Sequence, residues 1–185
     1  STAMWEKISK FITLLKKHFP GIKIVTGGPH ATSVRERCLK ECDSLDFLII
    51  GEGEITIVEL CKALQMGSSL ENVQGLVWRK GRQIIINSPR PLIQDLDKIP
   101  FPARDLVDNS RYVPAISQYK RLPSTIMITT RGCSYSCTFC ESTVYYRENG
   151  AAYRERSIPN VIQEIIEVSS KYNIRNIYIK FYISR

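Results

Sequence analysis

The sequence has few histidines, which together with cysteines are the usual ligands of structural zinc sites. Its 185 residues include two histidines, His18 and His30, and both lie far from three cysteines crowded into eight residues at positions 133, 137 and 140. A structural zinc site usually takes four protein ligands. No fourth cysteine and no histidine lies near the crowded group. As a zinc site, this group is therefore incomplete.

Long apolar runs are also absent. No run of about 18 apolar residues could cross a bilayer, and the start, STAMWEKISKF, lacks the unbroken apolar stretch of a secretory signal. The other three cysteines, Cys38, Cys42 and Cys61, lie in helix-like segments, which is not the pattern of a secreted disulfide framework. We expect a cytoplasmic protein with reduced thiols and no membrane contact.

Runs of basic residues are missing despite a net charge of +8. Residues 1–110 hold 15 basic and 13 acidic side chains (+2), and residues 111–185 hold 11 and 5 (+6). The excess is scattered among apolar residues and includes no base-stacking aromatic array. A solvated or anion-attracting face explains it better than nucleic acid, which is an unlikely partner.

What the sequence does contain is an alternation of strands and helices. Residues 5–15 form an amphipathic helix, and residues 22–26 and 46–50 form two short apolar strands, each followed by a glycine turn and a helix. Ser33 and Glu36 have the spacing of a capping box at the start of the helix after the first strand. This order predicts parallel strands in an α/β sheet.

Both glycine turns follow the carboxyl ends of their strands, where open α/β sheets bind ligands. Gly27 and Gly28 lie in the first turn, and Gly51 and Gly53 lie in the second. Without a Cβ, these residues allow a ligand to approach the backbone. The alternative is that they only form tight turns, but two such turns on successive strands favour a binding site.

The pattern changes after residue 70. Residues 75–86 indicate a β-hairpin that turns at Lys80 and Gly81, and residues 89–123 carry six of the nine prolines. The α/β alternation resumes with a strand at 124–129, the cysteine loop, a helix from Ser157 and a strand from 177. We predict domains at 1–70 and 123–185, joined by a hairpin and proline-rich linker at 71–122.

Three thiolates suit a 4Fe-4S cluster that leaves one iron open to an outside ligand. The residues RGCSYSCTFC resemble the CxxxCxxC motif of the radical S-adenosylmethionine (radical SAM) enzymes, including Phe139 before the last cysteine. The segments VTGGPHATS and DFLIIGEGEITIVEL resemble the second half of the cobalamin-binding domain in one branch of that family. LIQDLDKIPFPARDLVD resembles its linker, and RERSIPNVIQEIIEV resembles the first barrel helix.

The resemblance implies an α/β fold: a partial Rossmann-like cobalamin-binding domain, followed by the first strands of a (β/α) radical SAM barrel. Cys133, Cys137 and Cys140 are each expected to bind one iron, and the fourth iron to chelate S-adenosylmethionine. An electron from a flavodoxin- or ferredoxin-like donor then cleaves the sulfonium C–S bond to give methionine and a 5′-deoxyadenosyl radical, which abstracts a hydrogen from an unknown substrate. Backbone near Phe139 is expected to contact the adenine, and no side chain is assigned as catalytic.

In the cobalamin branch, methylcobalamin commonly delivers a methyl group to the substrate radical. Residues of both glycine turns match the positions that line the cofactor's nucleotide tail: Gly27, Gly28, Gly51, Glu52 and Gly53. The Asp-x-His-x-x-Gly loop that often supplies the lower cobalt ligand is not in the sequence, and His30 does not replace it because it follows the glycine turn. With two barrel strands, we expect a fragment of a longer enzyme that exposes apolar surface.

Two alternatives remain for the cysteine motif: a non-catalytic truncated remnant, and an iron-sulfur electron-transfer module. Other residues have simpler interpretations. We expect Cys38, Cys42 and Cys61 to pack as small apolar residues and Trp78 to pack across the hairpin. Residues 145–147, Tyr-Tyr-Arg, either contact a substrate or pack the cysteine loop.

Overall fold

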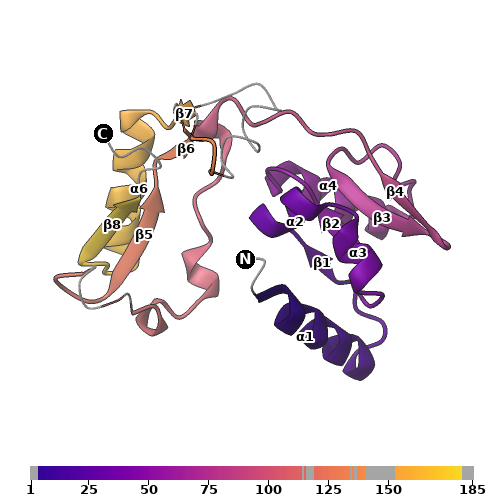
Figure 1. Ribbon diagram of the computed structural model, residues 1–185. Coiled ribbons are helices and arrows are strands. Elements are labelled where there is room, and N and C mark those ends of the chain that lie inside the picture. The colour runs from indigo at the N-terminus through magenta and orange to yellow at the C-terminus, as the bar shows by residue number, and fades with distance from the viewer. Residues whose placement is uncertain are drawn as a thin grey trace. The chain divides into compact units, whose positions relative to one another are not determined.

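The computed structural model describes residues 4–113, 115, 119–133, 135, 137–140 and 153–180. The chain divides into two compact units, Ser1–Leu92 and Ile93–Arg185. The first contains a four-stranded sheet, and the second contains two pairs of strands (Figure 1). Both units combine helices with strands, so the predicted α/β class is confirmed.

The sheet of the first unit has the order β1-β2-β3-β4. Its strands are β1 (Val25–Thr26), β2 (Phe47–Ile49), β3 (Leu76–Lys80) and β4 (Gln83–Ile86). The predicted parallel pairing joins β1 to β2, whereas β3 runs antiparallel to both β2 and β4. The hairpin, which sequence analysis grouped with the linker, therefore belongs to the first compact unit and completes its sheet.

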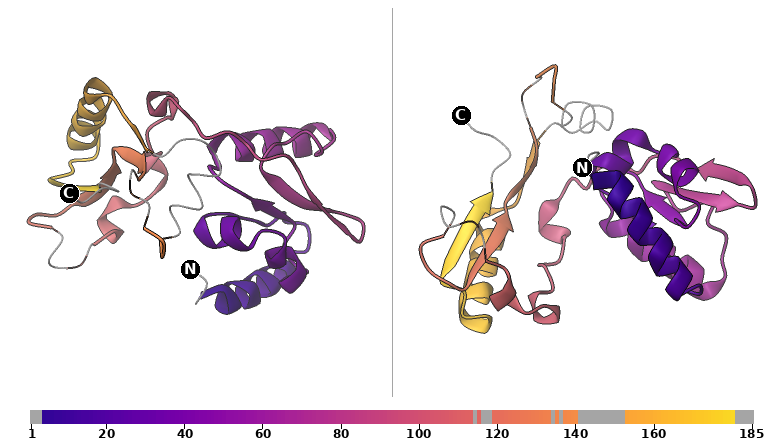
Figure 2. Two further views of the ribbon diagram at one scale, coloured as in Figure 1. Left: turned by 45° about the horizontal axis from the view of Figure 1, so that its top comes forward. Right: turned by 60° about the horizontal axis from the view of Figure 1, so that its bottom comes forward.

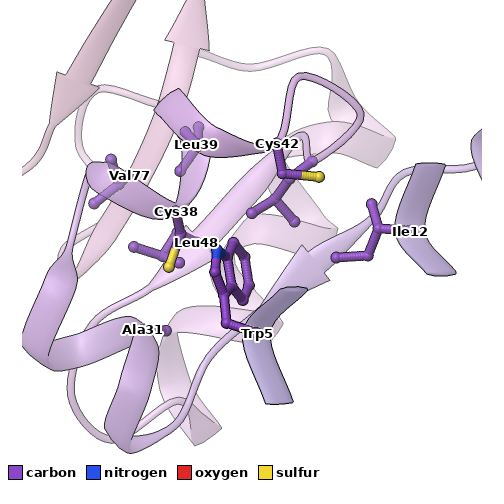
Figure 3. Packing of buried hydrophobic residues seen from close by; sticks show 9 residues of the cluster. Trp5, Ile12, Ala31, Cys38, Leu39, Cys42, Leu48 and Val77 are labelled. Carbon is purple, nitrogen blue, oxygen red and sulfur yellow. The ribbon is translucent and has the colours of Figure 1, made fainter. Parts of the chain in front are cut away.

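Helices cover both faces of this sheet. They are α1 (Trp5–His18), α2 (Pro29–Val34), α3 (Arg37–Glu41) and α4 (Glu54–Met66). Side chains alternate along β2, so Leu48 packs with residues of α1, α2 and α3, while Phe47 and Ile49 pack with α4. Figure 3 shows Trp5 of α1 lying close to Cys38 and Leu48 in the first of these clusters.

Three details of the first unit differ from the sequence-based expectations. No capping box starts α3, because Ser33 lies inside α2. That helix ends before Arg35, its C-cap, where φ is +51°. Cys61 is exposed rather than part of the core, although Cys38 and Cys42 are buried as expected. The hairpin turns at residues 81–82, one residue later than predicted.

The second unit contains a parallel pair of strands joined through a helix. The strands β5 (Ser124–Ile128) and β8 (Asn176–Lys180) pair in the register Met127↔Ile179. Helix α6 (Ile158–Lys171) lies across one face of the pair (Figures 1 and 2). Met127, Val168 and Ile174 are buried between these elements. Predicted strand residues 181–183 lie outside the described part of the chain.

A second, antiparallel pair links the cysteine segment to this unit. β6 (Thr130–Gly132) follows β5 after one residue, and β7 (Tyr153–Glu155) precedes α6. In its described residues, the proline-rich segment contains the short 3-10 turns η2 (Leu96–Lys98), η3 (Arg104–Leu106) and η4 (Asn109–Arg111). Across the described residues, every helix is too short or too polar to pass through a membrane.

Candidate cofactor-binding sites

The two glycine turns of the first unit lie at one edge of its sheet. Val25 pairs with Phe47 and Thr26 with Leu48 in the parallel β1-β2 pair. The turns that follow these strands therefore emerge at the same edge, as the sequence predicts. Gly28 is the N-cap of α2, and Gly53 is the N-cap of α4, so each turn leads directly into a helix.

The backbone at this edge is accessible in a way that only glycine allows. Gly28 and Gly51 have φ values of +88° and +86°, and a Cβ built on either would meet no described atom within 4 Å. The N–H of Gly51 donates a hydrogen bond to Oγ1 of Thr32 at 3.1 Å, which ties the second turn to α2. The backbone at Gly28 and Gly51 is therefore open to the approach of a ligand.

Two side chains near the turns have different surroundings. Glu52 is buried, with 8% of its surface exposed, so its peptide backbone rather than its carboxylate is the better candidate for contact with a ligand. His30 lies in α2, with its ring centroid 5.1 Å from that of Trp5. It is half-buried beside the α1 helix, two positions after the N-cap Gly28.

The three motif cysteines lie on the segment that follows β6. Cys133 and Cys140 are half-buried and Cys137 is exposed, and none of the six cysteines, all of which the structure describes, forms a disulfide. The main-chain N–H of Tyr135 donates to Sγ of Cys133 at 3.5 Å, and the N–H of Cys140 donates to the carbonyl of Cys137 at 3.1 Å.

In the described part of the chain, the three motif cysteines do not form a metal-binding group. Among the residues that the structure describes, no three histidine, cysteine or acidic side chains are close enough together to hold a metal ion. Phe139, between the second and third cysteines, is 91% exposed, so its ring is not packed in the fold. Residues 145–147 lie outside the described part of the chain.

Sequence analysis missed a buried ionic cluster beside the cysteine segment. Glu164 of α6 is 1% exposed and pairs with Arg104 of η3 and with Arg156, which follows β7. The cluster lines a cavity of about 160 Å³ together with apolar residues of β5 and the linker. Glu164 could have been noticed from sequence, because it interrupts the apolar stripe between Val161 and Val168.

Known proteins resemble the chain both in its first residues and over most of its length. Residues 1–61 match the family model described as B12 binding domain. The chain is 35% identical, over 83% of its length, to an uncharacterized methyltransferase of Pyrococcus horikoshii, and covers 32% of that protein. It is 29% identical, over 95% of its length, to the anaerobic magnesium-protoporphyrin IX monomethyl ester cyclase of a Synechocystis strain, and covers 33% of it.

Solved structures share the fold. The radical S-adenosylmethionine methyltransferase TsrM from Kitasatospora setae, with cobalamin and a [4Fe-4S] cluster bound, matches with a TM-score of 0.64 and 19% identity over 96% of this chain and 34% of that one. The cobalamin-dependent S-adenosylmethionine radical enzyme OxsB, with aqua-cobalamin and S-adenosylmethionine bound, matches with a TM-score of 0.69 and 20% identity. That match covers 98% of this chain and 25% of OxsB. The chain thus spans about one third of the length of its curated relatives.

Proposed function

We propose that the chain, whose residues 1–61 match the B12 binding domain, belongs to the radical SAM proteins that carry a cobalamin-binding domain, and that it binds a 4Fe-4S cluster, S-adenosylmethionine and cobalamin. The proposed activity is radical methyl transfer to a substrate still to be identified. The observation that carries the proposal is the set of three cysteines closely spaced in the sequence at 133, 137 and 140, on the segment that follows β6.

The donor set fits the cluster. Three thiolates without a fourth protein ligand leave one iron open, and Cys133 already accepts a main-chain hydrogen bond. When bound, the cluster supplies the electron that cleaves S-adenosylmethionine to methionine and a 5′-deoxyadenosyl radical. The chain's own part is to hold the thiolates and, through the backbone around Phe139, to bind the adenine. The electron donor in this proposal is a flavodoxin- or ferredoxin-like protein.

The glycine edge of the first unit fits the nucleotide tail of cobalamin. Gly28 and Gly51 present backbone that no Cβ covers, and Gly27 and Gly53 flank them at the same edge. The described packing of β1 and β2 holds these turns at a fixed separation. In the proposal the backbone of these residues, with that of Glu52, binds the tail and orients the cofactor.

The test is anaerobic reconstitution of the full chain with iron and sulfide, followed by electron paramagnetic resonance of the reduced protein with and without S-adenosylmethionine. Wild type is compared with Cys137→Ala and with the control Cys61→Ala, which removes an exposed thiol of α4 outside the motif. We expect a 4Fe-4S signal that shifts when S-adenosylmethionine is added, in wild type and Cys61→Ala only.

Two results would overturn the proposal in different ways. If no cluster assembles in the wild type, the chain is the non-catalytic alternative. If a cluster assembles but S-adenosylmethionine leaves its spectrum unchanged, no iron is open to that ligand, and the iron-sulfur electron-transfer alternative is favoured. A cluster that survives in Cys137→Ala would also contradict the proposed ligand set.

A further inference from the structure

The cysteine segment leaves and rejoins the described fold through the β6-β7 pair. Gly132, the last residue of β6, pairs with Tyr153, the first residue of β7, and Cys133 follows Gly132 directly. Residues 133–152 therefore connect the two strands of this pair, which we call the neck. Whatever fixes the neck also fixes where the first motif cysteine begins.

Arg156, the first residue after β7, attaches the neck to the rest of the unit. Its main-chain N–H donates to the carbonyl of Thr129 at 2.9 Å, and its guanidinium donates to the carbonyl of Ile128 at 3.1 Å. The same guanidinium donates to Oδ1 of Asn160 at 2.7 Å and to Oε2 of Glu164 at 2.5 Å. One side chain thus joins the neck to the end of β5 and to α6.

Glu164 extends this connection to the linker. Its second oxygen, Oε1, accepts a hydrogen bond from Arg104 at 2.7 Å, and Arg104 also donates to the carbonyl of Ile126 at 3.4 Å. Glu164 and Arg104 are 1% and 6% exposed. A single buried carboxylate therefore bridges two arginines that come from segments on either side of β5 in the sequence.

Such a cluster is a poor way to gain stability. Removing three charged groups from water costs free energy that their mutual attraction only partly offsets, and apolar replacements of such triads are often neutral or stabilising. In some proteins, buried polar or ionic groups instead specify one arrangement among several. Here the elements that it arranges are the β5 end, the neck, α6 and the linker turn η3.

We propose that Glu164 is a positioning residue for the cysteine loop: acting through Arg156, its carboxylate fixes the neck from which Cys133 emerges. This inference rests on the proposed function, because the loop is the proposed cluster site. It adds to that function a residue outside the motif, 24 positions after Cys140, that controls the geometry of the three thiolates.

The first test uses the chain without iron. Glu164→Gln keeps the size of the side chain but removes its charge. Arg156→Lys keeps the charge but removes the planar set of guanidinium N–H donors. Glu167→Gln is the matched control, since it neutralises a carboxylate on the same helix that pairs with Lys171 at 3.8 Å. Hydrogen exchange is measured at residues 130–132 and 153–155, and at the β5-β8 ladder.

We expect exchange in the neck to quicken about tenfold or more in Glu164→Gln and Arg156→Lys, with little change in the β5-β8 ladder and none in the control. Equal quickening in both ladders would overturn the proposal, because Glu164 would then stabilise the unit as a whole. Unchanged exchange in the neck would overturn it as well. Loss of folded structure in both variants would likewise assign Glu164 a purely structural role.

The second test uses the reconstituted protein. In Glu164→Gln we expect altered g values of the reduced cluster and a several-fold shorter cluster lifetime in air, with Glu167→Gln matching wild type. Retention of wild-type g values and lifetime would overturn the proposal. If wild type itself takes up no cluster, the proposed function fails for this chain, while the exchange experiment still decides whether Glu164 positions the neck.

Discussion

At Gly51 the backbone has a φ of +86° beside open space, and its N–H is already bound to Thr32. We expect Gly51→Ala to lower the free energy of unfolding by about 1 to 2 kcal/mol, because a Cβ is strained at positive φ, and also to weaken cobalamin binding. The measurements are urea denaturation and titration with hydroxocobalamin followed by absorbance.

Gly81→Ala is the matched control for this prediction. Gly81 has a φ of +62° in the hairpin turn, and a Cβ at this position would meet no described atom within 4 Å, so the substitution carries similar strain away from the glycine edge. We expect Gly81→Ala to lose comparable stability and to bind hydroxocobalamin as wild type does. Equal loss of cobalamin affinity in both variants would contradict the assignment of the site.

Cys38 and Cys61 offer a contrast in thiol chemistry. Burial raises the pKa of Cys38 to about 11 from an ordinary 9.0, helped by the negative charge of Glu41, whereas Cys61 is exposed. At pH 8 we expect iodoacetamide to alkylate Cys61 readily and Cys38 slowly, because the thiolate is the reactive form. Peptide mass mapping against time measures both rates in one sample.

The raised pKa of Cys38 also fixes the sign of a pH effect. Its contribution to stability is complete below the unfolded pKa of 9.0 and is lost as pH rises through the folded value of about 11. We expect the urea midpoint of wild type to fall over this interval more than that of Cys38→Ala. Alkylation of Cys38 as fast as Cys61 at pH 8 would contradict the buried position.

Among the structural elements, α6 begins at a carboxylate from the linker. The main-chain N–H of Ser157, its N-cap, donates to Oδ1 of Asp97 at 2.9 Å. Hydrogen bonds from the hydroxyl and the main-chain N–H of Ser157 hold the pKa of Asp97 below its ordinary value of 3.8. The charged form is therefore favoured in the folded state, as expected for an anion near a helix N-terminus.

From this arrangement we expect an acid-sensitive helix start. The stabilisation by Asp97 is complete above pH 3.8 and is lost as pH falls through the lower pKa of the folded chain. Between pH 5 and 3, the thermal midpoint of wild type should fall more than that of Asp97→Asn, measured by circular dichroism. Asp43→Asn, which alters an exposed carboxylate of the first unit, should keep the wild-type slope.

The same elements show how far the sequence could predict the fold. Periodicity located α1, α4, α6 and the strands of both parallel pairs, but it did not predict α2, which lies in the segment read as a turn. The cysteine motif can be read directly from the sequence. Where apolar residues surround most of a helix, periodicity could not indicate which face of the helix is buried. In α4 the buried positions are Thr56, Leu60 and Ala63, which leaves Cys61 outside; in α6 Glu164 and Val168 face inward.

The buried ionic cluster was unpredictable for a different reason. Arg104 and Glu164 are 60 residues apart in the sequence, and nothing local to either residue indicates that they meet. Long-range pairing of this kind follows only from the tertiary fold. The glycine edge was easier to predict, because parallel strands place their carboxyl ends together whatever the details of packing.

For the whole molecule, exposed apolar surface is the property that the structure makes most accessible to experiment. Ile158, Ile162 and Ile166 lie on successive turns of α6 and are 76%, 49% and 61% exposed. Such a stripe favours binding of a fluorescent apolar dye or association of chains. We expect the double variant Ile162→Gln/Ile166→Gln to bind less dye than wild type.

Met66→Gln is the comparison for that prediction, because Met66 is 77% exposed but lies at the end of α4 rather than in a stripe. Its dye binding should equal that of wild type. Dye fluorescence is measured with native chain well below its melting temperature, and size-exclusion chromatography reports association. A monomeric chain that binds no dye and melts cooperatively would contradict this prediction.

The pairing of Gly132 with Tyr153 brings together the two ends of the segment that carries the motif cysteines, and this affects how the chain would bind iron. The β6-β7 pair joins residues 132 and 153, so the entropy of ring closure is lost when the chain folds, before any metal arrives. Thiols tethered in one ring of this size meet at effective concentrations on the order of millimolar, whatever the dilution of the protein. Capture by one chain should therefore follow first-order kinetics in protein and outcompete clusters shared between chains.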